Sequence, residues 1–244
     1  AELAKAREDL TKFVKHLRRG PTWPDMPEVD VPMATKAPKI DGKLSDPAWA
    51  KAASFEGEYP FNQTEQSDSS STTWKILWDE TYIYIAYDCT DTDIQAPEMP
   101  RDDNVYFHDC VEAFILPEPR TMVYWELVVS PSGSIFDGLH LKRREKWGCI
   151  HGKEEDLQGL QVGTDIRGTV GNSEDTDKGY TVELAIPFRE LPEYSRTKPA
   201  AGHELHLMLV RLDKSAKAFK VYAFQPLMNW GHNIWNHVKV TLKR

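Results

Sequence analysis

The fold is decided by three segments that follow one another in a fixed order: IDGKLSDPAW (residues 40–49), TTWKILWDETYIYIAYDCTDTD (residues 72–93) and HDCVEAFIL (residues 108–116). The first is an acidic turn with a tryptophan, the second an aromatic hairpin and the third a strand that carries carboxylates. This order predicts a β-sandwich that holds a polar ligand against aromatic rings.

The rest of the chain has the same short β pattern. Residues 72–78 and 81–88 are rich in Thr, Ile, Tyr and Trp around a tight Asp79-Glu80 turn, which predicts a hairpin. Further strands are expected near residues 110–116, 123–130, 159–170, 179–186, 204–212, 218–224 and 237–242. About nine or ten strands at short spacing, without long intervening helices, indicate an all-β fold, a two-sheet antiparallel sandwich of the jelly-roll or immunoglobulin-like kind.

Two regions are expected along the chain. Residues 1–38 comprise a predicted amphipathic helix (1–19) and a linker with five prolines (21–38), and residues 39–244 form the sandwich domain. Within the domain, Asp46 followed by Pro47 predicts a short capped helix near residues 46–53, with Trp49 turned inward.

Composition excludes some classes of function. The formal charge of −8 and the lack of a long basic run give no footprint for a phosphate backbone, so we do not expect a nucleic-acid partner. No apolar run reaches the roughly 18 residues of a membrane span. Three cysteines, Cys89, Cys110 and Cys149, lack metal-site spacing; a Cys89–Cys110 bridge is conceivable, but buried free thiols are the favoured interpretation.

The motifs together resemble the family 9 carbohydrate-binding modules and their relatives. The resemblance covers about residues 39–242 and continues past the first three segments through ELVVSPSGSIFD (126–137), GYTVELAIPFREL (179–191) and ELHLMLVRLD (204–213). It implies a β-sandwich, bound calcium and recognition of a polysaccharide or oligosaccharide. It also implies a secreted, periplasmic or cell-surface protein that acts in polysaccharide degradation, as an accessory to a glycoside hydrolase.

The resemblance assigns one wall of a sugar-binding slot to Tyr106, which lies three residues before Asp109 of the D-x-V-E strand. Asp109 is also expected among the ligand-binding residues, and Glu112 falls where a family carboxylate binds hydroxyl groups. Tyr106 stands in place of the more usual Trp. The alternatives are that Tyr106 packs on a loop and that Glu112 pairs with an arginine.

The opposite wall is expected in the loop QPLMNWGHNIWNH (225–237), where Trp230 is the nearest match. Gln225 and Asn229 could reach sugar hydroxyls, and Arg211 could point to the same face as a hydrogen-bonding fork, with a salt bridge to Glu112 as its alternative.

The other tryptophans are weaker ligand-binding candidates. Trp235 is expected in the core, as are Trp49, Trp74 and Trp78. Trp125 is a reserve candidate, because its strand has two apolar phases. Trp147 follows the basic segment 142–146, the place to look if the ligand is an acidic polysaccharide.

Metal ligands are expected among Asp88, Asp91 and Asp93, where a strand runs into a loop. Calcium prefers six to eight oxygen ligands, and such a loop could supply several. The spacing is not that of an EF-hand, so solvated loop acids are the alternative and the resemblance is what favours calcium.

Two other classes of function remain open. Asp109, Glu112 and Glu126 on neighbouring strands could form a carboxylate pair for glycoside cleavage. A haem-binding redox module would need axial ligands such as Met208 or Met228 with His237. No hydrolase, phosphate-loop or zinc-protease motif supports catalysis.

Overall fold

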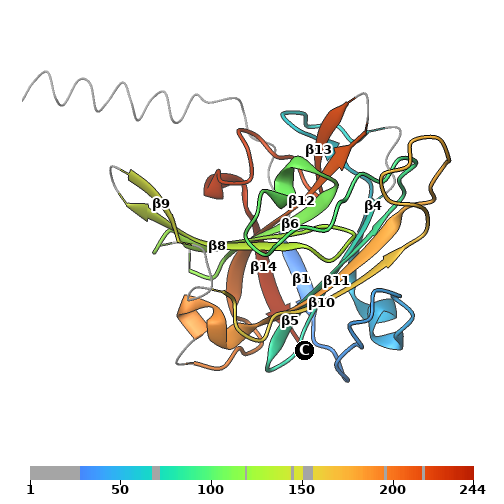
Figure 1. Cartoon of the computed structure of the whole chain (residues 1–244). Coiled ribbons are helices and arrows are strands. Elements are labelled where there is room, and N and C mark those ends of the chain that lie inside the picture. Colours follow the sequence, from blue (N-terminus) through green and yellow to red (C-terminus); the bar gives the residue numbers. More distant parts are fainter. Residues whose placement is uncertain are drawn as a thin grey trace, which may run out of the picture.

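The computed structural model describes residues 28–67, 72–118, 120–143, 146–150, 156–194, 197–215 and 218–244. These residues form two packed β-sheets joined by loops and short 3-10 helices (Figure 1). The all-β prediction is confirmed. The predicted helix over residues 1–19 lies outside the described residues.

The larger sheet has nine strands, with the order β1-β14-β12-β6-β7-β8-β9 and with β13 and β3 continuing from β12. All of its pairs are antiparallel except β1 with β14. Its strands are β1 (Val29–Pro32), β3 (Tyr59–Pro60), β6 (Cys110–Leu116), β7 (Val123–Val129), β8 (Ile135–Arg143), β9 (Lys146–Ile150), β12 (Glu204–Lys214), β13 (Phe219–Ala223) and β14 (Val238–Lys243).

The smaller sheet has five strands in the order β10-β11-β5-β4-β2. They are β2 (Ala53–Glu56), β4 (Thr72–Trp78), β5 (Tyr82–Cys89), β10 (Gln161–Ile166) and β11 (Tyr180–Pro187). The predicted hairpin is the β4–β5 pair, and Asp79 closes its turn by accepting hydrogen bonds from the backbone N–H groups of Thr81 and Tyr82 at 2.7 and 2.8 Å.

The core lies between the sheets. Trp74 and Trp78 of β4 are fully buried in it, as their alternation with polar positions predicts. The indole N–H of Trp78 donates to the carbonyl of Lys243 at 2.9 Å, which ties the smaller sheet to β14 of the larger one. Cys89 and Cys110 are buried free thiols, which confirms the favoured interpretation for these two.

Five 3-10 helices lie in the loops: η1 (Pro47–Lys51), η2 (Val105–Phe107), η3 (Phe188–Glu190), η4 (Pro192–Tyr194) and η5 (Ile234–Asn236). η1 is the predicted short helix, and its cap is the Asp46 side chain, which accepts from the backbone N–H of Ala48. Trp49 is buried as expected, and its indole N–H donates to the buried Glu183 carboxylate at 2.8 Å. The described residues include no helix with the length and apolar character that a membrane crossing needs.

The sandwich begins earlier in the chain than residue 39. β1 pairs in parallel with β14, and Met33 forms a bridge with Trp78. Residues 29–33 of the predicted linker are therefore part of the larger sheet and its surroundings. Val29 and Val31 are buried by this pairing, so the prolines nearby end the strand without excluding it from the domain.

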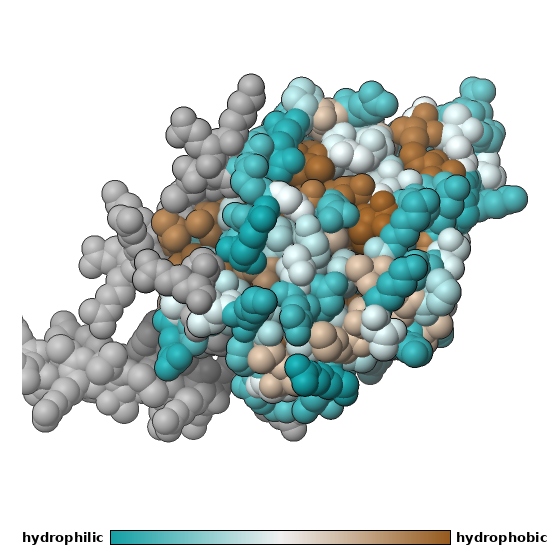
Figure 2. Space-filling view, turned by 90° about the horizontal axis from the view of Figure 1, so that it is seen from below, coloured by the Kyte–Doolittle hydropathy of each residue, from teal (hydrophilic) through white to brown (hydrophobic). Residues whose placement is uncertain are grey.

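The two faces of the larger sheet have different surroundings. Glu112 of β6 lies opposite Val210 of β12, whereas Arg211 lies opposite Val111. Since directly paired residues share a face and neighbours along a strand alternate, Glu112 and Arg211 point to opposite faces. Arg211 points into the sandwich and Glu112 points to the outer face, which carries the candidate site. Figure 2 shows one surface of the molecule, where hydrophobic patches lie among hydrophilic side chains.

Candidate functional site

A pocket of about 470 Å³ lies on the outer face of the larger sheet. We call it the slot. It is lined by Tyr106, Phe107, Glu112, Glu126, Phe136, His140, Trp230 and His232. Three of the residues predicted from the sequence, Tyr106, Glu112 and Trp230, are thus brought together, although they come from three separate segments of the chain.

The floor of the slot consists of alternate residues on β6, β7 and β8. Glu126 lies opposite Phe114 and Gly138, and Tyr124 lies opposite His140, so their side chains share the face of Glu112. Glu112 is 2% exposed and Glu126 6% exposed. Burial, and then repulsion from Glu126, raises the pKa of Glu112 well above its ordinary value. The floor therefore presents two adjacent buried carboxyl groups.

The first wall comes from η2. The half-buried Tyr106 ring packs edge-to-face on Phe136 at a centroid distance of 5.7 Å and on Phe107 at 5.0 Å. Its hydroxyl donates to the Asn104 side-chain oxygen at 2.6 Å, which fixes the orientation of the ring. Phe107 is 62% exposed, and sequence analysis did not select it.

The second wall comes from the loop before β14. Asn229 and Trp230 adopt left-handed backbone conformations, with φ of 60° and 76°. For a tryptophan this conformation costs on the order of 1–3 kcal/mol, and such costs concentrate at functional sites. The loop is held by a hydrogen bond from the Asn229 N–H to the Asn62 side chain at 2.9 Å and by edge-to-face packing of Trp230 on Phe61 at 5.5 Å.

Two histidines stand beside Glu126 in the slot. His140 Nε2 lies 2.6 Å from Glu126 Oε2, and His232 Nε2 lies 3.6 Å from Glu126 Oε1. The hydroxyl of Tyr124 hydrogen-bonds to His232 Nδ1 at 2.9 Å, and the Tyr124 ring stacks on His140 at 4.8 Å. Burial lowers the pKa of His232. Neither histidine belongs to a motif with a recognisable spacing, so neither was predicted from the sequence. The available signal for His140 was the alternation that places Tyr124 and Glu126 on one face of β7 and His140 opposite Tyr124 on β8.

Four predicted ligand-binding residues do not line the slot. Arg211 is 1% exposed and lies between the sheets, because the register places it on the inner face. Asp109 is buried, and its carboxylate accepts hydrogen bonds from the backbone N–H groups of Gln95 and Lys214. Gln225 is half-buried outside the slot. Asn229 is exposed, and the hydrogen bond from its backbone N–H to the Asn62 side chain positions the loop that carries Trp230.

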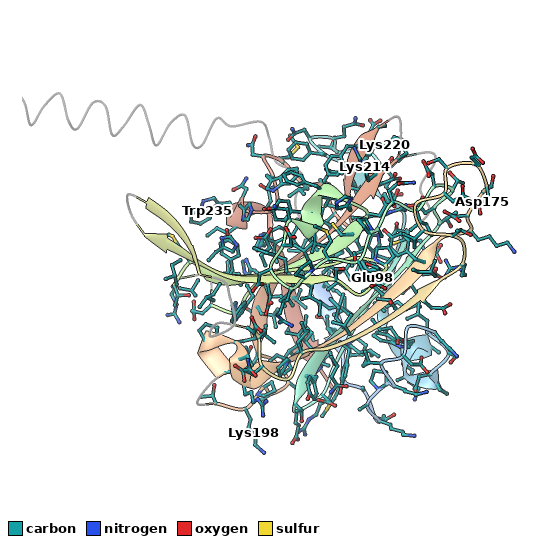
Figure 3. All side chains as sticks on the ribbon, viewed as in Figure 1. Glu98, Asp175, Lys198, Lys214, Lys220 and Trp235 are labelled. Carbon is teal, nitrogen blue, oxygen red and sulfur yellow. The ribbon has the colours of Figure 1, made fainter. Side chains whose placement is uncertain are left out.

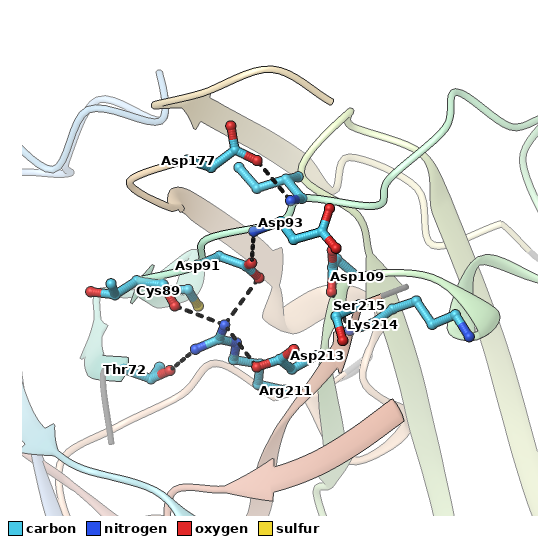
Figure 4. Close-up of polar contacts among 12 residues, drawn as sticks. Thr72, Cys89, Asp91, Asp93, Asp109, Asp177, Arg211, Asp213, Lys214 and Ser215 are labelled. Atoms are coloured by element: carbon cyan, nitrogen blue, oxygen red, sulfur yellow. Dashed lines mark hydrogen bonds and ion pairs between the residues drawn. The ribbon is translucent and has the colours of Figure 1, made fainter. Parts of the chain in front are cut away.

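Arg211 is the centre of a buried ionic cluster (Figure 4). Its guanidinium contacts the carboxylates of Glu58 at 2.9 Å, Asp91 at 3.1 Å and Asp213 at 3.5 Å. These three carboxylates take the place of the salt bridge to Glu112 that was the alternative for Arg211. We call these four residues the Arg211 cluster.

The predicted metal ligands are divided by the structure. Asp88 forms an ion pair with Arg167 at 2.7 Å, and Asp93 accepts from the Ser173 hydroxyl at 2.8 Å. Only Asp91 belongs to a group that could hold an ion, together with Asp109 and Asp213. Calcium binding by Asp88, Asp91 and Asp93 together stays a prediction, and the structure gives Asp88 and Asp93 other polar partners.

The Asp91, Asp109 and Asp213 group suits a hard cation. One ligand oxygen from each lies within 4.8 Å of the others. Burial, and then the charge of Asp91, raises the pKa of Asp109 to about 8. Three carboxyl groups are a donor set that a cation with oxygen preference, such as calcium, would accept.

Three tryptophan predictions have separate outcomes. Trp235 was expected in the core but is 72% exposed on η5, at the periphery of the molecule (Figure 3). The correction follows from the turn of η5, which buries Ile234 and Asn236 and directs Trp235 outward. Trp125 is buried, and its indole N–H donates to the Glu190 carbonyl at 3.1 Å, so it is not a slot residue. The side chain of Trp147 lies outside the described residues.

The haem alternative has little support in the geometry. Met208 and His237 are both buried, but the Nε2 of His237 hydrogen-bonds to the carbonyl of Gly231 at 2.7 Å. Burial lowers the pKa of His237 to about 4, so the ring is neutral and its Nε2–H donates. The hydrogen bond from His237 to Gly231 holds the loop that forms the second wall.

The fold and site define a β-sandwich module with an aromatic-walled slot on the outer face of one sheet. Residues 40–127 match a family model described as carbohydrate family 9 binding domain-like. A family 9 module of Caldicellulosiruptor kristjanssonii in complex with cellotriose superposes with a TM-score of 0.58 at 17% identity, over 89% of this chain and 94% of that chain. The resemblance predicted from the sequence is confirmed for residues 40–127, which match the family model, and the solved module shares the fold of this chain.

Two further relatives extend the comparison. A putative carbohydrate-binding protein from Bacteroides uniformis has a TM-score of 0.67 at 13% identity and covers 89% of this chain and 98% of that chain. Exoglucanase XynX of Acetivibrio thermocellus is 27% identical over 154 residues, or 63% of this chain. The aligned part is 12% of the length of that relative.

Proposed function

We propose that this chain is a carbohydrate-binding module that recognises a polysaccharide or oligosaccharide in the slot. The observation that carries the proposal is the convergence of Tyr106 and Trp230, from distant segments, on one pocket that the carboxyl groups of Glu112 and Glu126 also line. The volume of about 470 Å³ lies within the range of small-ligand pockets.

The chemistry of the slot matches that of a sugar ring. A pyranose has apolar C–H faces that pack on aromatic planes and a rim of hydroxyls that hydrogen-bond to carboxyl oxygens. Tyr106 and Trp230 supply the planes, while Glu112 and Glu126 supply acceptors at the floor. Each ring contributes about 1 kcal/mol beyond the burial of its area.

The relatives support a glucose-containing ligand. Structures of the C. kristjanssonii module exist with cellotriose and with glucose, the second at a TM-score of 0.57 and 14% identity. We therefore take cello-oligosaccharides as the first ligands to test for this chain.

The test is calorimetric titration of the protein with glucose and cellotriose, followed by tryptophan fluorescence. Trp230→Ala should weaken binding at least tenfold, because it removes one wall of the slot. Trp235→Ala is the matched control, since that ring is exposed outside the slot, and it should bind like the parent protein. A polysaccharide and glycan panel without any binding partner for the intact protein would refute the proposal.

The wider biological setting belongs to the same proposal. The chain would act outside the cytoplasm, secreted, periplasmic or at the cell surface, and accompany a glycoside hydrolase in polysaccharide degradation. XynX, a far longer exoglucanase with a segment similar to this chain, supports that setting. A calcium ion held by Asp91, Asp109 and Asp213 would stabilise the end of the sandwich.

A second candidate function is glycoside cleavage. It is supported by the position of Glu112, whose pKa is raised by burial and then by the charge of Glu126, since glycosidases use a pair of carboxyl groups of which the acid has a raised pKa. Asp109 is excluded from that pair by its position away from the slot. Incubation with a polysaccharide panel distinguishes the two functions: cleavage requires new reducing ends that Glu112→Gln abolishes, whereas a binding module releases none.

A further inference from the structure

The floor of the slot holds two histidines that the proposed sugar recognition does not use, and both lie next to Glu126. Glu126 from β7, His140 from β8 and His232 from the loop before β14 each direct one ligand atom to a common point, with these atoms within 4.8 Å of one another. We call them the His–Glu cluster. Two imidazoles and one carboxylate are a donor set used for zinc and other divalent transition metals.

The distances fit a tetrahedral ion. With metal–ligand bonds of about 2.0–2.1 Å, two ligand atoms of a tetrahedral site lie about 3.3 Å apart. The cluster has a His140 Nε2 to Glu126 Oε2 distance of 2.6 Å and a His232 Nε2 to Glu126 Oε1 distance of 3.6 Å. These two distances involve the two different oxygens of the Glu126 carboxylate. One ligand atom from each of the three residues lies within 4.8 Å of the others, so side-chain shifts of about 1–2 Å would bring three single ligand atoms to the tetrahedral separation.

The two histidines are also oriented by contacts with Tyr124. Metal-binding histidines commonly use their second ring nitrogen for a hydrogen bond that fixes the tautomer. The Tyr124 hydroxyl makes this contact with His232 Nδ1 at 2.9 Å, which directs Nε2 of His232 toward Glu126. The Tyr124 ring also stacks on His140, nearly parallel to it at an angle of 5°, and so restricts its rotation.

The loop that carries His232 is held close to the sheet. His237 Nε2 donates to the carbonyl of Gly231 at 2.7 Å. A Cβ atom at Gly231 would lie 2.3 Å from the Phe114 ring, so a larger residue could not occupy this position without moving the loop. Glycine therefore allows the approach that places His232 over β7.

We propose that Glu126, His140 and His232 bind one divalent transition-metal ion, with Zn²⁺ as the representative ion, at the floor of the slot. This site is distinct from the oxygen-only Asp91, Asp109 and Asp213 group, because imidazole nitrogen favours zinc, copper or nickel over calcium.

Three protein ligands leave a tetrahedral ion with one open position, which here faces the slot. An oxygen of the bound ligand, a sugar hydroxyl or a carboxylate of an acidic sugar, would take that position. This second step rests on the proposed sugar-binding function, whereas binding of the metal does not.

The first experiment measures metal binding alone. Untagged protein, stripped with a chelator and dialysed, is titrated with Zn²⁺ by calorimetry, and we expect one ion per chain. His140→Gln and His232→Gln should each weaken binding at least tenfold, and Tyr124→Phe should weaken it about 10-fold through loss of the orienting contact. His203→Gln is the control, because His203 lies outside the slot, and it should bind normally.

Two measurements keep the test valid if the variants fail to fold. Cobalt bound to the parent protein should give the intense visible absorption of a four-coordinate site. Zn²⁺ should also protect His140 and His232, but not His203, from diethylpyrocarbonate, as read by mass spectrometry. The proposal would be overturned if the parent protein did not bind Zn²⁺ stoichiometrically. It would also be overturned if Zn²⁺ protected all three histidines equally.

The second experiment separates the metal site from sugar binding. Cellotriose and an acidic oligosaccharide are titrated into the stripped and the Zn²⁺-loaded protein, and loading should raise the affinity for at least one of them tenfold or more. Zn²⁺ binding with unchanged sugar affinity would refute the role of the open position. Zn²⁺ binding without any sugar binding would refute the proposed function and leave the metal site standing.

Discussion

The slot floor and the Arg211 cluster are two buried polar groups on the same sheet, and they differ in what satisfies their charge. In the Arg211 cluster, an arginine of β12 neutralises carboxylates from within the protein, between the two sheets. At the slot floor, Glu112 and Glu126 lie side by side on the outer face, and burial, followed by repulsion from Glu126, raises the pKa of Glu112. A closed charge network stabilises the fold, whereas an incompletely compensated one, open to a pocket, is available for a ligand.

The largest expected effect comes from breaking the closed network. Arg211→Met should lower the free energy of unfolding by about 3–5 kcal/mol, because it leaves Glu58 and Asp91 as buried charges without their shared cation. Urea denaturation measures it. The exposed pair of Arg189 and Glu190 provides the control, since Arg189→Met should change stability by under about 1 kcal/mol. Equal effects in the two variants would contradict this account of the cluster.

The next effect concerns calcium at the Arg211 cluster's edge. If Asp91, Asp109 and Asp213 hold calcium, an ion concentration 100-fold above the dissociation constant stabilises the protein by about 2.7 kcal/mol, which a chelator should remove. Thermal unfolding with and without chelator reads the shift. Asp213→Asn should abolish the response and the exposed Asp175→Asn should keep it, so a response lost in neither variant would place the ion elsewhere.

A smaller effect is expected from pH, near the second wall. Burial lowers the pKa of His237 to about 4 from 6.5, so the unfolded chain takes up a proton between these values that the folded chain does not. This contribution to stability is complete above pH 6.5 and is lost as the pH falls, by about 2 kcal/mol at pH 5. His237→Gln should show a correspondingly smaller loss of stability between pH 7.5 and pH 5 in urea titrations. An unchanged pH dependence would show that His237 is not the responsible group.

The smallest expected effect distinguishes Glu112, which lies on β6, from Asp109, which directly precedes that strand. Glu112→Gln should weaken sugar binding about tenfold, or about 1.4 kcal/mol, with little effect on stability, because its side chain faces the slot. Asp109→Asn should do the reverse, lowering stability through its bonds to the backbone of Gln95 and Lys214 while leaving the affinity of the folded protein unchanged. The comparison fails if both substitutions alter the same property.

Much of the slot was predictable from local patterns. The alternation in the hairpin predicted that the strand face carrying Trp74 and Trp78 is buried. The resemblance predicted that Tyr106, Glu112 and Trp230 belong to one site. One signal was overlooked: Asp109 and Glu112 are three residues apart, so on an extended segment they point to opposite faces and are poor candidates for one ligand. The same alternation, applied to Glu126 and the following strand, would have drawn attention to His140.

The all-β class, the short helix capped by Asp46 and the hairpin around Asp79 could be predicted from the sequence alone, because each depends on residues close together along the chain. The inward orientation of Arg211, the contact of His232 with Glu126 and the pairing of β1 in the larger sheet became known only from the three-dimensional fold. Alternation orders side chains within one strand, but the register between strands and the path of a loop depend on contacts between distant segments. Those contacts assign one polar cluster to the interior and leave the other open at the slot.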